Sequence, residues 1–294
     1  MKLSSLRTDL LDIKNNNTLF LETEFNARKD ALEFIALIKN LFLTSDSKFE
    51  IKSIYYEAIQ LEKLIIDLNH KLYQKFLSRI QALDRLETLR TLLAPFTSYR
   101  SNKHGQAHYG YENIDGLLEG ILTPYQKPEP TLNRDYGMVR YEPTPASVIL
   151  ELVDKINFTK NDVFYDLGSG LGKVVGLVNI LTGVSCVGVE FEPSYYNYAT
   201  QRAAFLNLDN IRYINSDARS TNYSDGTVFF LFNPFGGKIF ETVFEILHQE
   251  SFKRQITVCS YGTSTVPIAE LPWLHIADQN FIHDFKLAIF KSKI

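Results

Sequence analysis

A short segment of the sequence combines glycines with an acidic residue. Residues 166–173 read Asp-Leu-Gly-Ser-Gly-Leu-Gly-Lys and follow the apolar run Val-Phe-Tyr. Glycines in a turn between a strand and a helix let a ligand approach the backbone closely. A dinucleotide pyrophosphate favours the spacing G-x-G-x-x-G, whereas this segment has G-x-G-x-G with Asp166 before the first glycine. An acid at this position favours a cationic ligand, and S-adenosylmethionine carries an ammonium and a sulfonium but no phosphate.

Two further acids follow the next two strand-like segments. Glu190 ends Cys-Val-Gly-Val-Glu, 24 residues after Asp166, where a carboxylate accepts hydrogen bonds from ribose hydroxyls. Asp217 and Ala218 follow Ile-Arg-Tyr-Ile-Asn-Ser, where the acid is predicted to face the amino group of adenine. Each acid alone is as often an ordinary surface or capping carboxylate. Their ordered recurrence at strand ends favours one shared binding site.

Candidates for the reaction itself lie at two other junctions. The apolar run Thr-Val-Phe-Phe-Leu-Phe is typical of a central strand, and Asn233, Pro234 and Phe235 follow it. The Asn233 carboxamide is predicted to orient a nucleophile or hold the methionine end of a cofactor, and Phe235 to wall the pocket. The alternative is a simple turn capped by the asparagine. Thr144 precedes the predicted helix Ala-Ser-Val-Ile-Leu-Glu-Leu-Val-Asp-Lys-Ile, where its hydroxyl either binds ligand or caps that helix.

Strands and helices alternate from about residue 146, which positions these residues. Parallel strands joined by helices explain this alternation. The last two strand-like segments, LHIADQNFIHD and FKLAIFKSK, are too close together for a crossover helix, which predicts an antiparallel pair. The predicted fold class is therefore α/β, with a Rossmann-like, doubly wound and mostly parallel sheet of seven strands that ends in this pair.

The first 94 residues have a different composition. All 15 glycines and all 10 prolines lie at or beyond Pro95. Apolar residues at steps of three or four from Leu61 to Leu93 predict one long helix that begins near a capping box of Ser47 and Glu50 and ends before Pro95. An earlier helix is predicted around residues 31–42. The apolar stripe favours core packing between helices over a partner-binding coiled coil.

Three domains are predicted from these patterns: helices over residues 1–94, a connector or lid over 95–133 with a short helix near 113–121, and a catalytic domain over 134–294. His104 and His108 have the i, i+4 spacing of a metal pair, but they lack an accompanying acid and neighbouring glycines weaken a helix there. We therefore expect no metal.

Composition excludes several classes of protein. The chain has 294 residues, of which 45% are hydrophobic and 22% charged, which excludes wholesale disorder. No apolar run is long enough for a membrane span, the N-terminus lacks a signal-peptide pattern, and two isolated cysteines cannot form a disulfide framework. A cytoplasmic protein without membrane contact is expected. A net charge of −3 gives no support for a nucleic-acid partner.

The segments YEPTPASVILELV, DVFYDLGSGLGKVV, VGVE, SDA and FFLFNPFGG together resemble class I S-adenosylmethionine-dependent methyltransferases. They are most similar to the disruptor of telomeric silencing family, the non-SET histone lysine methyltransferases, and its bacterial relatives. The resemblance implies an S-adenosyl-L-methionine site made by Thr144, Asp166, Gly168, Ser169, Gly170, Lys173, Glu190, Asp217, Ala218 and Asn233. It also implies that Tyr141, Phe235 and Asn233 act at the substrate channel. Lys173 stands where the family usually has glutamine.

These features predict direct transfer of a methyl group to nitrogen, with a protein lysine as acceptor. The order Asn-Pro-Phe also resembles a truncated N-P-P-Y signature of enzymes that methylate planar amino groups, so adenine or glutamine nitrogen is an alternative acceptor. A different alternative is a cofactor-binding scaffold whose helical domain serves interactions.

Overall fold

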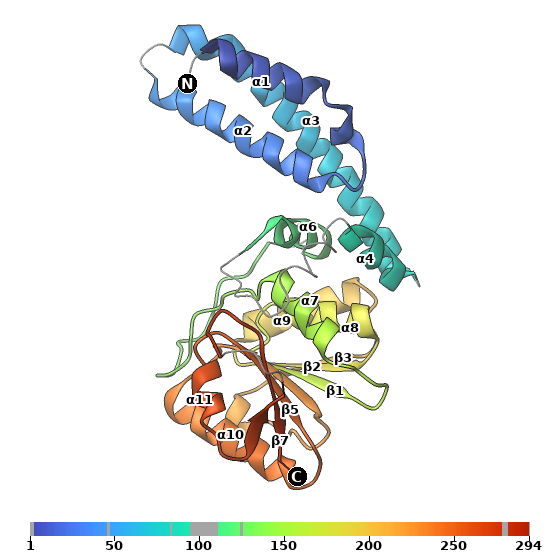
Figure 1. The fold of residues 1–294 in the computed structure, drawn as a ribbon, viewed down its shortest axis with the longest axis vertical. Helices are drawn as coiled ribbons and strands as arrows, with labels where there is room; N and C mark the ends of the chain where they lie inside the picture. The colour runs from blue at the N-terminus through green and yellow to red at the C-terminus, as the bar shows by residue number, and fades with distance from the viewer. Residues whose placement is uncertain are drawn as a thin grey trace.

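The computed structural model describes residues 3–45, 48–82, 84–94, 111–123, 126–277 and 282–293. A layer of long helices from the first part of the chain projects from a sheet domain that contains the rest (Figure 1). Smaller helices lie between these two parts.

A single seven-stranded sheet organises the second part of the chain. Its strands are β1 (Val163–Leu167), β2 (Ser185–Glu190), β3 (Ile211–Asn215), β4 (Val228–Phe232), β5 (Thr257–Tyr261), β6 (Leu274–Ile276) and β7 (Ala288–Ser292). The strand order is β3-β2-β1-β4-β5-β7-β6. The first five strands pair in parallel, and β7 runs antiparallel to both β5 and β6. The predicted fold class and the terminal antiparallel pair are confirmed.

Helices cover both faces of the sheet (Figure 1). They are α7 (Ala146–Lys155), α8 (Lys173–Thr182) and α9 (Pro193–Phe205) on one face, and α10 (Gly237–Ser251) and α11 (Thr265–Ala269) on the other. Alternation along each strand supplies the two cores: Phe164 of β1 packs into the first and Tyr165 into the second. Strands buried on both faces explain the nearly continuous apolar runs in the sequence.

Three helices form the outer part of the N-terminal region. These are α1 (Leu3–Asn15), α2 (Phe25–Thr44) and α3 (Lys48–Gln81), with the short 3-10 helix η1 (Asn17–Phe20) between the first two. Their own core contains Leu6, Leu10, Leu19, Ala31, Ile35, Ile38, Ile54, Ala58, Leu61 and Ile65. The predicted helix around residues 31–42 and the predicted role of the stripe in core packing are confirmed.

The prediction of one helix from this stripe to Pro95 is wrong. Helix α3 ends at Gln81, and a separate helix, α4 (Arg85–Leu93), follows. The sheet domain contacts α3 where this helix ends: Asn207 donates a hydrogen bond from Nδ2 to the Gln81 carbonyl at 2.9 Å, and Gln81 donates from Nε2 to the Phe205 carbonyl at 2.6 Å. The break lets α4 pack on α8. The predicted capping box at Ser47 lies outside the described residues.

One apolar core continues from the helical region into the sheet domain. The second half of α3, α4, α6 (Asn113–Leu122), α7 and α8 all contribute to it. Ile80, Leu89, Ile121 and Ile149 are all fully buried members of this cluster. The short helix expected near 113–121 is thus confirmed, and it packs between the two parts of the molecule. The domain limits at residues 94 and 133 stay a prediction.

The apolarity of the helices and the state of the two cysteines can be read from the structure. Within the described residues, none of the helices combines the length and apolarity that crossing a bilayer requires. Cys186 and Cys259 are both buried free thiols.

Candidate cofactor site

A cleft opens at the carboxyl ends of β1, β2, β3 and β4, where sheets of this type bind ligands. Its volume, including the open mouth, is about 860 Å³. The predicted residues that line it are Tyr141, Gly168, Glu190, Asp217, Ala218, Asn233 and Phe235. A smaller cavity shares Tyr141 and Gly168 with the cleft and is also lined by Thr144, Asp166, Ser169 and Lys173. The structure therefore brings the sequence candidates together at one sheet edge.

The glycine turn after β1 requires glycine on steric grounds. Gly168 and Gly170 have φ angles of +78° and +52°, which side chains rarely tolerate. A Cβ atom on Gly168 would lie 2.4 Å from Pro234, and one on Gly170 would lie 2.2 Å from the ring of Tyr141. Tyr141 thus packs directly on the turn, beside Tyr195, whose ring centroid is 5.3 Å away.

Glu190 at the end of β2 braces this turn. Its carboxylate accepts hydrogen bonds from the backbone N–H groups of Gly170 at 2.7 Å and Glu192 at 2.8 Å. The side chain is buried, and burial raises its pKa although these hydrogen bonds oppose the change. The predicted ribose acid therefore also has a structural function, because it holds the glycine turn against β2.

Asp166 is a buried acid of the site with a raised pKa. Its side chain is 3% exposed, and burial, with the neighbouring charge of Glu190, raises its pKa to about 8. Among the described residues no hydrogen-bond donor contacts its carboxylate. Within the described residues, Asp166 therefore has no neighbouring cation that would stabilise its charged form.

Asp217 is already paired. Arg219 donates to its carboxylate from the backbone N at 2.8 Å, from Nε at 3.0 Å and from Nη2 at 2.6 Å. These hydrogen bonds lower the pKa of Asp217 against the effect of burial. Arg219 also contacts Asp135 at 3.0 Å. The acid predicted to face adenine lies in the cleft, next to Ala218, but it shares its oxygens with an arginine that the sequence analysis did not consider.

Asn233 has a strained backbone and a fixed side chain. Its φ angle of +46° is rare outside glycine. Its Oδ1 accepts hydrogen bonds from the backbone N of Ser264 and the hydroxyl of Thr263, both at 3.1 Å. Gly262 is needed there because a Cβ atom would overlap the Asn233 amide. The loop after β5, which the sequence analysis missed, thus orients the asparagine at the cleft, and the Gly-Thr-Ser run after a strand was its only signal.

Thr144 and Lys173 lie together behind the cleft. Helix α7 begins at Ala146 with Pro145 as its N-cap, so the alternative that Thr144 caps this helix is wrong. Asp115 of α6 instead accepts from the Ala146 N–H at 2.7 Å. The Lys173 ammonium donates to Asp115 at 2.6 Å and to the Thr144 carbonyl at 2.8 Å. Lys173 therefore joins α8 to α6 and α7, and burial lowers its pKa.

A strap formed by residues 129–142 borders the cleft. Glu192 anchors it by accepting from the Thr131 hydroxyl at 2.6 Å and the Leu132 N–H at 2.8 Å. Burial opposes the ionisation of Glu192, but these and further hydrogen bonds lower its pKa to about 2. At the other end, Met138 pairs with Phe235 in an isolated β-bridge. Glu192 and the strap were not foreseen, although the sequence Glu-Pro at a helix start signalled an N-cap.

Residues 133–229 match the family model described as "Histone methylation protein DOT1". The match covers about one third of the chain and contains the glycine turn and the acids that follow β1, β2 and β3. The chain is a class I S-adenosylmethionine-dependent methyltransferase. The methyltransferase fold accounts for the strand order, and the expected family resemblance is confirmed. A search of proteins with curated descriptions found no match.

Solved structures similar to this methyltransferase align with its sheet domain only loosely. An RNA methyltransferase from Salinibacter ruber in complex with S-adenosyl-L-homocysteine is 22% identical, with a TM-score of 0.42, over 51% of this chain and 92% of that chain. The human methyltransferase 10 domain containing protein is 19% identical, with a TM-score of 0.39, over 52% and 85%. A precorrin-6y C5,15-methyltransferase from Geobacter metallireducens is 13% identical, with a TM-score of 0.40, over 54% and 94%.

The residues of the cleft fit this cofactor. S-adenosylmethionine supplies the transferable methyl group when it is bound. Asp166 is a buried acid that receives no hydrogen bond from the described residues, and it offers a carboxylate to the cationic end of such a molecule. Gly168 of the glycine turn lines the cleft, beside Pro234. Tyr141 and Phe235 line the same cleft as Asn233. The described residues contain no group of three acids, histidines or cysteines that could hold a metal ion, and His104 and His108 lie outside them.

Proposed function

We propose that this methyltransferase transfers a methyl group to the side-chain nitrogen of a protein lysine. The match of residues 133–229 to the histone methylation family carries the proposal. The wall of the cleft supports it, because Met138, Phe232, Phe235 and Ile239 make the space next to Asn233 apolar. An apolar environment lowers the pKa of a lysine ammonium and so favours the neutral amine that acts as nucleophile.

The residues at this wall act mainly by position and by excluding water. Asn233 is held by Thr263 and Ser264, so its Nδ2 donor has a fixed direction. The strap closes one side of the cleft through the bridge from Met138 to Phe235. Alignment of nucleophile and methyl group in a dry space accounts for much of the rate in such transfers.

The experiment supplies tritiated-methyl S-adenosylmethionine and a mixture of histones, other cell proteins and nucleic acid. Label in protein that survives nuclease and disappears when lysines are acetylated beforehand is expected. Gly168→Ala should abolish this label, because its Cβ atom would overlap Pro234. Gly183→Ala is the matched control: Gly183 also has a positive φ of +73°, but nothing lies within 4 Å of its Cβ position. Label that acetylation leaves unchanged would contradict the proposal.

A nucleic-acid base is the second candidate acceptor. Arg134 and Arg140 both line the cleft and are exposed, and neither has a hydrogen-bond or ion-pair partner among the described residues. Free arginines at a mouth of this kind attract phosphate groups. Label that nuclease removes, and that Arg140→Gln reduces, would favour this candidate.

We place the reaction in the cytoplasm, because both cysteines are free thiols.

A further inference from the structure

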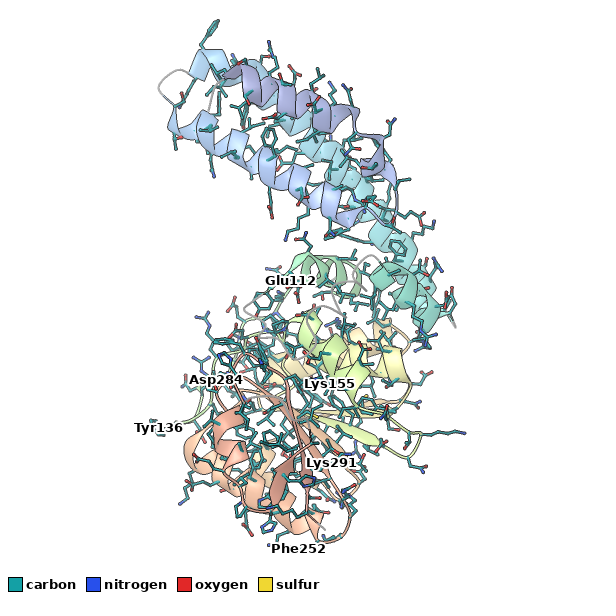
Figure 2. All side chains as sticks on the ribbon, in the orientation of Figure 1. Glu112, Tyr136, Lys155, Phe252, Asp284 and Lys291 are labelled. Atoms are coloured by element: carbon teal, nitrogen blue, oxygen red, sulfur yellow. The ribbon has the colours of Figure 1, made fainter. Side chains whose placement is uncertain are left out.

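A second cavity lies on the other side of the glycine turn. Its volume, including its open mouth, is about 1020 Å³. Helices α6 and α9, the glycine turn and Lys29 of α2 enclose it, and its charged lining residues are Lys29, Glu112, Asp115, Glu119, Lys127, Lys173 and Arg202. Tyr141 lines both this cavity and the cofactor cleft. Figure 2 shows Glu112, one of the residues that line this cavity, between the helical layer and the sheet domain.

Arg202 of α9 is buried in the wall of this cavity with most of its donors unused. Its side chain is 5% exposed. Among the described residues its guanidinium makes one hydrogen bond, from Nη1 to the carbonyl of Leu171 in the glycine turn at 3.3 Å. An arginine has five N–H donors and does not lose its proton in proteins. The remaining donors therefore face the cavity as a fixed positive charge.

The acids around the cavity do not neutralise this charge. Asp115 forms an ion pair with Lys173 and also accepts from the Ala146 N–H. Glu119 pairs with Lys127. Glu112 takes part in the capping box of α6, and burial raises its pKa to about 7, which reduces its negative charge. Four positively charged side chains line the cavity, and within the described part of the chain Arg202 is the one that forms no ion pair with an acid.

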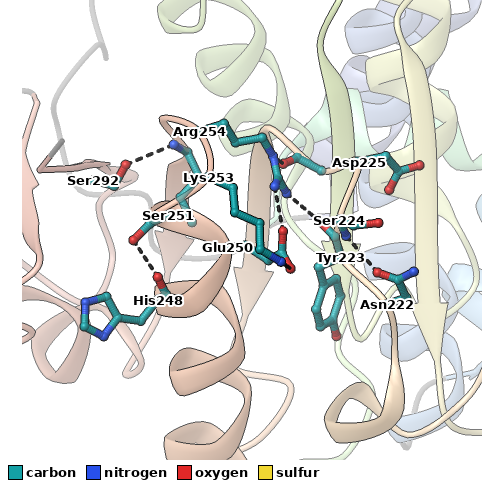
Figure 3. A network of polar contacts seen from close by, with 12 residues as sticks. Asn222, Tyr223, Ser224, Asp225, His248, Glu250, Ser251, Lys253, Arg254 and Ser292 are labelled. Carbon is teal, nitrogen blue, oxygen red and sulfur yellow. Dashed lines mark hydrogen bonds and ion pairs between the residues drawn. The ribbon is translucent and has the colours of Figure 1, made fainter.

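A structural arginine elsewhere in the same domain shows the contrast. Arg254 donates from Nη1 to Glu250 at 2.6 Å, from Nε to the Gly226 carbonyl at 2.8 Å and from Nη2 to the Tyr223 carbonyl at 2.6 Å (Figure 3). Every nitrogen of that guanidinium has an acceptor. Burial of a cation without such partners is unfavourable, because the charge loses its hydration and gains nothing in return.

We propose that this cavity binds a small organic oxyanion, a carboxylate or a phosphate ester, on the guanidinium of Arg202. Carboxylates and phosphates accept paired hydrogen bonds from an arginine fork. Without its open mouth the cavity has a volume of about 390 Å³, which is enough for a small organic anion. Because Arg202 also holds the Leu171 carbonyl and Tyr141 separates the two cavities, the anion is an effector that stabilises the glycine turn, and it is distinct from the methyl acceptor.

The test titrates the full-length protein with phenyl phosphate and, separately, with benzoate, by calorimetry at low ionic strength. Saturable binding of at least one probe is expected, and the stronger of the two identifies the ligand class. Arg202→Gln should weaken the affinity for that probe at least tenfold. Lys238→Gln is the matched control, because Lys238 is an exposed cation that lines neither the cofactor cleft nor this cavity, and the affinity of this variant should equal that of the wild type.

A second variant covers the case in which Arg202→Gln does not fold. Glu119 is exposed on α6. Burial lowers the pKa of Arg202, and the negative charge of Glu119 opposes this change, so the two side chains interact. Glu119→Gln should therefore tighten anion binding about threefold or more, because it removes a repelling charge. Absence of saturable binding up to high millimolar concentrations, equal affinity in Arg202→Gln, or weaker binding in Glu119→Gln would overturn the proposal.

Discussion

The helical region and the catalytic domain treat their buried polar groups differently. In the helical region Arg28 is 1% exposed, and it donates to Asn69 Oδ1 at 2.6 Å and to the carbonyls of Leu19 and Leu21 at 3.0 and 2.6 Å. In the catalytic domain Asp166 has no donor and Arg202 has one acceptor among the described residues. Both domains bury charge, and the catalytic domain satisfies some of it, as at Arg254. Asp166 and Arg202 differ from Arg28 because the described residues do not supply their full set of partners.

This difference separates stability from function. A buried polar group with a full set of partners stabilises one arrangement of the chain. A buried polar group without partners costs stability, and a protein retains it where a ligand completes the set. The following predictions test that distinction.

The largest effect is expected in the helical region. Arg28→Met leaves Asn69 and the carbonyl groups of Leu19, Leu21 and Glu22 without this donor, so the free energy of unfolding should fall by about 3–5 kcal/mol. Urea denaturation followed by circular dichroism measures this loss. Cofactor affinity, measured by calorimetry on the folded fraction, should not change. A loss of less than about 1 kcal/mol would show that the partners of Arg28 are not needed for stability.

Asp166→Asn should have opposite effects on stability and on binding. The amide resembles the protonated acid, so it avoids the cost of a buried carboxyl, and at pH 7 the free protein should gain on the order of 2 kcal/mol. Affinity for S-adenosylmethionine should fall by about 1–3 kcal/mol because a charged partner is lost. Thermal unfolding and calorimetry give the two values. A variant that is both less stable and unimpaired in binding would refute the assignment of Asp166 to the ligand.

Asp166 also predicts a pH dependence. Its pKa is raised to about 8 by burial and by Glu190, above its value in the unfolded chain, so the stability linked to its proton is present below about pH 4 and is lost as the pH rises toward 8. A cationic ligand favours the ionised acid, so affinity for the cofactor should increase with pH by at most about tenfold per unit and level off above pH 8. Asp166→Asn should lack this component, and equal slopes in both proteins would contradict it.

The smallest effect is expected at the strap. Arg219 joins Asp135 of the strap to Asp217 of the cleft, and exposed ion pairs contribute little. Arg219→Gln should accelerate cofactor dissociation about two- to threefold, measured by stopped-flow fluorescence. Lys238→Gln, at an exposed position outside the cleft lining, is the control. Slower dissociation would instead mean that Arg219 competes with the cofactor for Asp217.

Local pattern in the sequence determined much of this protein. The alternation of apolar runs and helical segments predicted the sheet, since the central strands β1, β2, β4 and β5 are buried on both faces. The glycine spacing and the acids at the ends of three strands predicted one cleft, because the carboxyl ends of parallel strands meet at one edge. Each strand and the acid or glycine turn at its end form one short segment of the chain. The sequence pattern of that segment can therefore be recognised without knowing its contacts in space.

Only the tertiary structure decided which partners these residues have. Lys173 pairs with Asp115, 58 residues away, and Gln81 contacts Phe205, 124 residues away. The first contact assigns to helix packing a residue predicted for the cofactor, and the second ends a helix whose apolar periodicity continues. Arg202 has no local signal at all, because the burial that makes its charge significant comes from elements distant in the chain. Hydrogen bonding and desolvation depend on proximity in space, which periodicity along the sequence does not specify.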